Sequence, residues 1–118
     1  MAIDLTALKE VNGFIGACLV DGESGMMLAG VSGNIKFDLE AAGAANAEFI
    51  KAKHKAMELL GLDDHIEDIL ITLGTQLHII RPMASNAGLF LYLALDRKSA
   101  NLGMARLAVK NVEGTLKL

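Results

Sequence analysis

Apolar residues recur with the spacing of an α-helix between Asp38 and Leu60. At about 100° per residue they form one broad stripe, with a ridge of small side chains beside it. The stripe consists of Leu39, Ala42, Phe49, Ile50, Met57 and Leu60, and the ridge consists of Ala41, Ala45, Ala52 and Ala56. One stripe can pack on the domain's own sheet, so the alanine ridge predicts a second helix as its neighbour. The pattern therefore predicts self-association.

The remaining apolar segments are short and read as strands. Two of them, Phe14 to Val20 and Leu89 to Asp96, are apolar at both alternating sets of positions, which is typical of strands covered on both faces. A turn rich in glycine follows the first of these and predicts a hairpin. The predicted strands are residues 14–20, 26–31, 67–73, 76–83 and 89–96.

Two further helices are predicted at the ends of the chain. Asp4 is placed to cap a short helix that carries Leu5 and Leu8 and stops at Gly13. The last segment has an apolar stripe at steps of three and four residues, formed by Leu102, Ala105, Val109, Val112 and Leu116. The predicted order is α-β-β-α-β-β-β-α in one domain, residues 1–118. We expect an α+β fold, an α/β sandwich whose five-stranded antiparallel sheet has the long helix on one face and the terminal helices on the other.

The predicted strand from Glu67 to Leu73 has the features of an open sheet edge. It contains no proline and no inward lysine that would deter pairing with another strand. Pairing with its own copy across a two-fold axis would join two sheets and bring two alanine ridges together. We therefore predict a homodimer, in which Asn46 either bonds to nearby backbone or meets its symmetry mate. The expected interface residues are Ala41, Ala45, Asn46, Ala52, Ala56, Asp68, Leu70 and Thr72.

Composition excludes several classes of function. A formal charge of -3, one Tyr and no Trp provide neither the basic field nor the stacking surfaces of nucleic-acid binding. The longest apolar run, Leu89 to Leu95, is far shorter than the roughly 20 residues that cross a bilayer. The single Cys18 excludes an internal disulfide and fits a reducing compartment. We expect a cytoplasmic protein that neither binds nucleic acid nor inserts into a membrane.

No set of residues forms a recognisable catalytic or cofactor site. The glycines match neither a phosphate-binding loop nor a dinucleotide-binding turn. Cys18 lies in a strongly apolar strand, which favours a buried, inert thiol over a nucleophile. The acidic stretch from Asp63 to Asp68 could offer oxygen ligands, but its spacing matches no calcium or zinc motif. We expect no enzyme activity, no metal and no cofactor.

Several short motifs, in this order and spacing, resemble the roadblock (dynein light-chain) family. They are Gly16-Ala17-x-Leu19-Val20-Asp21 before the first turn, the strand pair ending in Arg81-Pro82, and Asn101-Leu102-Gly103-x-x-Arg106 opening the last helix. The resemblance implies a non-enzymatic dimer, formed through the long helix and the third strand, that binds or regulates a Ras-like small GTPase. The helix after Ser99 makes the chain more similar to stand-alone prokaryotic members than to dynein subunits.

Two functional hypotheses follow. The first is a dimeric scaffold or regulator that binds a Ras-like small GTPase and activates or localises it. Charged residues on the long helix are the expected partner surface, namely Glu48, Lys51, Lys55 and Glu58. The alternative is a small-molecule-sensing domain of profilin- or longin-like fold, in which Asn46, His78 and Tyr92 would supply the polar contacts in an apolar pocket.

Overall fold

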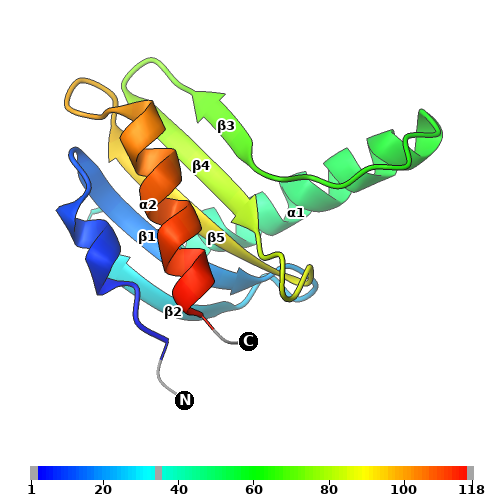
Figure 1. Ribbon diagram of the computed structural model, residues 1–118, viewed down its shortest axis with the longest axis horizontal. Coiled ribbons are helices and arrows are strands. Elements are labelled where there is room, and N and C mark those ends of the chain that lie inside the picture. The colour runs from blue at the N-terminus through cyan, green and yellow to red at the C-terminus, as the bar shows by residue number, and fades with distance from the viewer. Residues whose placement is uncertain (1–2, 34–35, 117–118) are drawn as a thin grey trace.

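The structure, a computed structural model, describes residues 3–33 and 36–116. Its elements follow the predicted order (Figure 1). They are η1 (Thr6–Glu10), β1 (Phe14–Asp21), β2 (Met27–Ser32), α1 (Leu39–Leu59), β3 (Ile69–Thr72), β4 (Gln76–Pro82), β5 (Leu89–Asp96) and α2 (Leu102–Thr115).

The strands form one antiparallel five-stranded sheet in the order β2-β1-β5-β4-β3. The two strands predicted to be covered on both faces, β1 and β5, are neighbours at the centre, and β3 lies at an edge as expected. Central strands have both faces buried, which explains why their sequences are apolar at every position. The predicted α+β fold is confirmed.

Helices cover both faces of the sheet, as predicted. In Figure 1 η1 and α2 lie in front of the sheet and α1 lies behind it. One core lies between the sheet and the terminal helices and includes Leu19, Leu93 and Val109. A second core lies between the sheet and α1 and includes Val20, Ile50 and Phe90. Alternate residues of each strand supply the two cores, because side chains alternate across a strand.

The long helix has the predicted ends. The Asp38 carboxylate caps its first turn by accepting a hydrogen bond from the Ala41 N–H at 3.0 Å. Gly61 follows its last turn with φ +68, and the Leu62 N–H donates to the Met57 carbonyl at 3.0 Å. A glycine suits this left-handed position because it has no Cβ.

The predicted apolar stripe of α1 is only partly buried. Leu39, Ile50 and Met57 are buried, whereas the exposed fractions of Phe49 and Leu60 are 43% and 70%. The reason is that α1 packs on β1 and β2 and then extends past the β3 side of the sheet (Figure 1). Its last turns therefore lie beyond the sheet that the stripe was expected to cover.

The predicted first helix is a 3-10 helix rather than an α-helix, and Asp4 is not its cap. Leu5 holds the cap position. The Asp4 carboxylate instead accepts hydrogen bonds from the Thr6 N–H at 2.9 Å and the Thr6 hydroxyl at 2.6 Å. The segment before Gly13 is too short for several α-helical turns, and a short 3-10 helix buries Leu5 and Leu8 just as well.

Candidate functional site

Strand β3 is a regular, open edge of the sheet. Its four residues pair in unbroken register with β4, from Ile69 opposite Ile80 to Thr72 opposite Leu77. The other edge, β2, carries a register shift opposite Leu19 and Val20. Bulges of that kind protect an edge from further pairing. Of the two edges, β3 is therefore better suited to receive another strand.

The structure places the three interface candidates of the third strand differently. Leu70 and Thr72 are exposed on β3. Asp68 precedes β3, which is shorter than predicted, and its side chain is only 10% exposed. Its carboxylate accepts a hydrogen bond from the Arg106 Nε at 2.9 Å and lies 3.7 Å from the Arg81 guanidinium. Asp68 thus holds the start of β3 against β4 and α2.

The alanine ridge of α1 lies on the surface of the isolated chain. Ala41, Ala45 and Ala52 are exposed and Ala56 is half-buried. Asn46 beside them donates from its Nδ2 to the Ala42 carbonyl at 2.9 Å, within the same helix. The ridge leaves a strip of small side chains uncovered.

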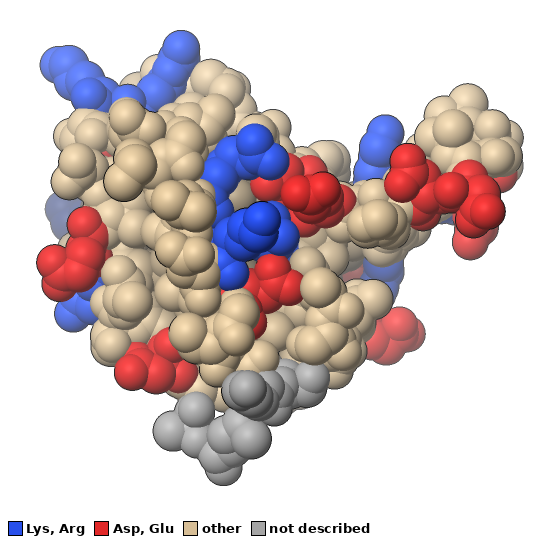
Figure 2. Space-filling model, in the orientation of Figure 1, with Lys and Arg blue, Asp and Glu red and all other residues tan. Residues whose placement is uncertain are grey.

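The end of α1 stands out from the rest of the molecule, with acidic side chains beside an uncharged tip (Figure 2). This tip is apolar, since Leu59, Leu60 and Leu62 are exposed by 80%, 70% and 53%. Phe49 on α1 is also exposed. Together with the three leucines it gives the outer part of α1 an exposed apolar surface. Such surfaces commonly mark contacts with another protein.

The four charged residues of the expected partner surface are all exposed on α1. Lys51 ties this surface to the β1–β2 turn, because its Nζ donates to the Glu23 carbonyl at 2.9 Å. The same Nζ lies 3.4 Å from Glu48 Oε1. Lys55 and Glu58 continue the row toward the end of the helix. The row is a mixed-charge surface rather than a field of one sign.

Asn46, His78 and Tyr92, the polar residues of the alternative hypothesis, do come together. The Tyr92 hydroxyl lies 3.3 Å from His78 Nδ1 and interacts with the Asn46 side chain. Burial, and less strongly Cys18, raises the pKa of the Tyr92 hydroxyl far above its usual range, although Asn46 acts in the opposite direction. Gln76 joins this group, since its Oε1 lies 2.7 Å from His78 Nε2, although the sequence hypothesis did not name it. Residues two apart on a strand face the same side, so the sequence could have predicted that Gln76 lies beside His78.

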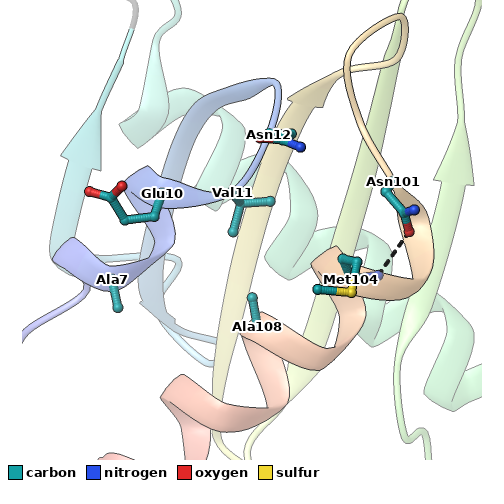
Figure 3. Close-up of a pocket in the computed structure, with 7 residues that line it drawn as sticks. All are labelled: Ala7, Glu10, Val11, Asn12, Asn101, Met104 and Ala108. Carbon is teal, nitrogen blue, oxygen red and sulfur yellow. Dashed lines mark hydrogen bonds between the residues drawn. The ribbon is translucent and has the colours of Figure 1, made fainter.

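A groove between η1 and α2 forms a separate surface feature, which the sequence did not predict. Its volume is about 260 Å³, and the side chains of Val11, Met104 and Ala108 face its interior (Figure 3). Asn12 and Asn101 lie at one end, where Asn101 Oδ1 accepts a hydrogen bond from the Met104 N–H at 3.0 Å. Ala7 and Glu10 of η1 complete the lining. The groove offers mainly apolar contacts and amides.

The candidate reactive groups are placed in inert settings. Cys18 is fully buried, and burial raises the pKa of its thiol to about 12. Asp64 accepts a hydrogen bond from the His65 N–H at 2.8 Å. Within residues 3–33 and 36–116 no three His, Cys, Asp or Glu side chains gather as metal ligands would. In the same ranges no helix is long and apolar enough to cross a membrane.

Comparison with solved structures places this architecture among roadblock-type folds. The chain matches a Roadblock/LC7 domain from Streptomyces avermitilis with a TM-score of 0.77 and 12% identity, over 93% of this chain and 88% of that one. It matches MglB from Myxococcus xanthus with a TM-score of 0.74 and 17% identity, over 86% and 72%. For the gliding protein MglB from Thermus thermophilus the TM-score is 0.74 at 21% identity, over 92% and 78%.

At these identities the likeness concerns the fold, and it confirms the roadblock-type fold that the resemblance implied. The sequence itself matches no family model and no curated protein. Apolar patterning can keep a fold while individual residues change, which explains how structure is shared where sequence is not.

Proposed function

We propose that this chain is a non-enzymatic, cytoplasmic scaffold or regulator that forms a homodimer and binds a Ras-like small GTPase. The observation that carries the proposal is the pair of uncovered surfaces on one side of the molecule. These are the regular β3 edge and the part of α1 that extends past it.

A two-fold axis perpendicular to the sheet at β3 would cover both surfaces with the second copy. Antiparallel pairing of β3 with its copy keeps both α1 helices on the same face of a continuous sheet. Each α1 end then lies over the partner's sheet, where Phe49 and Leu60 lose contact with water. The alanine ridges let the two helices approach closely, because small side chains occupy little space between helix axes.

The proposed binding of a small GTPase rests on the family resemblance and on the roadblock-type fold. The row from Glu48 to Glu58 is the proposed contact surface, since it remains exposed on α1 beside the proposed dimer interface. Mixed charges in such a surface govern the rate and selectivity of association more than its final affinity.

Oligomeric state tests the first part of the proposal. Light scattering should show a dimer at micromolar concentration, and Ala52→Glu should convert it to a folded monomer because it places a charge in the helix contact. Ala7→Glu, the same substitution at an exposed position on η1, which lies on the other face of the sheet from α1, is the matched control and should stay dimeric. A stable wild-type monomer would contradict the proposal.

Partner binding tests the second part. The tagged protein should retain a small GTPase from native lysate, differently with GDP and with a non-hydrolysable GTP analogue, and the identified GTPase should bind when purified. The chain alone should hydrolyse no GTP. Unchanged binding by the Lys51→Glu, Lys55→Glu double variant would remove the assigned contact surface. Retention of no GTPase with either nucleotide would remove the regulatory function.

The convergence of Asn46, His78 and Tyr92 supports small-molecule sensing as a second candidate. Three polar groups in an apolar wall are a common design for holding a small ligand. A thermal-shift screen of metabolites tests it. A rise of the unfolding midpoint with one metabolite, lost in Tyr92→Phe, would favour sensing. If no metabolite raised the midpoint, the sensing hypothesis would be rejected and the scaffold hypothesis would remain.

A further inference from the structure

His78 lies on the α1 side of the sheet, in the area that the proposed dimer contact would cover. It lies on β4 directly opposite Ile71 of β3, near the end at which β3 finishes. Its side chain is half-buried, and the chain's own α1, which packs mainly on β1 and β2, reaches this region through Asn46. The α1 of a second copy would enter from the far side of β3. By the two-fold symmetry it passes over the end of this β3, and so over His78.

The hydrogen bonds of His78 suit a neutral imidazole. Nε2 lies 2.7 Å from Gln76 Oε1, and the Tyr92 hydroxyl lies 3.3 Å from Nδ1 and 3.4 Å from Nε2. A neutral imidazole has one donor and one acceptor nitrogen and can satisfy an amide and a hydroxyl, whereas the charged ring has two donors and no acceptor.

In the described part of the chain, aromatic and uncharged side chains pack against His78. Phe37 meets the ring edge-on with centroids 6.4 Å apart, and Tyr92 does so at 5.3 Å. Ile71 on β3 and Asn46 on α1, which shares the Tyr92 hydroxyl, are also uncharged. Burial lowers the pKa of the imidazole, because the charged form loses more hydration than the neutral one.

We propose that homodimerisation of this chain is linked to the proton on His78, so that the dimer holds a neutral imidazole and acidification separates the subunits. The proposal rests on the homodimer proposed above. A second α1 and the segment after it carry charges of both signs, namely Glu48, Lys51, Lys53, His54, Lys55, Glu58, Asp63, Asp64 and Glu67. The row from Glu48 to Glu58 stays exposed in the proposed dimer, so the linkage comes from the loss of water around His78 under the apolar Phe49 and Leu60 of the second copy.

The size of the effect follows from linkage. Covering His78 in the dimer disfavours the charged ring, so its pKa is lower in the dimer than in the monomer. Between these two pKa values the monomer binds more protons than the dimer, and dissociation therefore increases as the pH falls through this range. A symmetric dimer holds two copies of His78, and the two effects multiply. Because burial already lowers the His78 pKa of the single chain below 6.5, the apparent Kd should change little from pH 7.5 to 6.5 and rise roughly tenfold from pH 6.5 to 5.5.

Sedimentation equilibrium of the full chain at pH 7.5, 6.5 and 5.5 tests this linkage. The wild type should dissociate increasingly as the pH falls, whereas His78→Gln, which keeps a polar side chain but cannot titrate in this range, should have a pH-independent Kd. His65→Gln changes an exposed histidine outside α1 and should behave like the wild type. Histidine NMR titration adds a direct measure, with a lower His78 pKa in the dimer than in the Ala52→Glu monomer.

The outcomes separate this inference from the dimer itself. A wild-type dimer whose Kd does not change with pH would overturn the linkage and leave the homodimer intact. Equal His78 pKa values in the dimer and in Ala52→Glu would do the same, even if His78→Gln failed to fold. A wild type that is monomeric at every pH would overturn both.

Discussion

The Arg81 guanidinium on β4 donates a hydrogen bond to the Glu113 carboxylate on α2, with 2.6 Å between Nε and Oε1. The second carboxylate oxygen accepts from the Ala84 N–H, also at 2.6 Å. Arg81 in turn lies 3.7 Å from Asp68, just before β3. Two nearly buried acids and one arginine thus connect α2 to the end of β4 and to the start of the edge strand.

Replacing Glu113 should weaken this connection. Glu113→Ala leaves the Arg81 guanidinium and the Ala84 N–H without their carboxylate acceptor. Both hydrogen bonds are partly buried, so water can only partly replace the lost acceptor. We expect a loss of about 2 kcal/mol in the free energy of unfolding, measured by urea denaturation at pH 7. Glu10→Ala, at an exposed position on η1, should change it by less than about 0.5 kcal/mol. Equal losses in the two variants would contradict the role of the pair.

The contribution of Glu113 should depend on pH. Burial raises the pKa of its carboxyl, but hydrogen bonds from Ala84 and Arg81 and the charges of Arg81 and Lys110 lower it more, so it lies below 4.5. A carboxyl with a depressed pKa in the folded state stabilises the protein above its unfolded pKa and loses that effect as the pH falls through its folded pKa. The stability difference between wild type and Glu113→Ala should therefore be constant above about pH 5 and shrink below pH 4.5. A difference that stayed constant down to pH 3 would contradict this explanation.

Gly43 lies close against the sheet on α1. A Cβ added there would lie 2.9 Å from the Val20 Cγ2 on β1, too close for a normal contact. Gly43→Ala should therefore destabilise the protein by about 1 kcal/mol, although alanine is the better helix former. Gly114→Ala on α2, where nothing lies within 4 Å of the added Cβ, should instead stabilise it by about 0.5 kcal/mol. Thermal unfolding of the two variants gives the comparison, and shifts of the same sign would refute it.

Gly61 tests the end of α1. Its φ of +68 disfavours any residue with a Cβ, while no neighbour lies within 4 Å of the added atom. Gly61→Ala should cost about 1 kcal/mol from backbone strain alone. Gly74→Ala, which is equally open but lacks a positive φ, should be neutral or slightly stabilising. Amide exchange should show faster fraying of the last α1 turn only in Gly61→Ala.

Elements with a strong local signal were predictable from the sequence. Asp38 and Gly61 fixed both ends of α1, and the uninterrupted apolar runs identified β1 and β5 as central strands. These features depend on capping and on side-chain periodicity, which involve residues close together in the chain. The interface role of the alanine ridge stays a prediction, because it concerns a second chain.

Features that join distant segments were decided by the tertiary structure. The sequence did not show that Glu113 would meet Arg81, that Gln76 would complete the contacts of His78, or that η1 and α2 would leave a groove between them. It placed Phe49 in a buried stripe, since helical spacing gives the direction of a side chain but not how far the sheet beneath it reaches. Periodicity along the chain therefore determined the elements and their faces. The placement of α1, which packs on β1 and β2 and extends past β3, decided which of those faces stay open, because the sheet beneath the helix ends before the helix does.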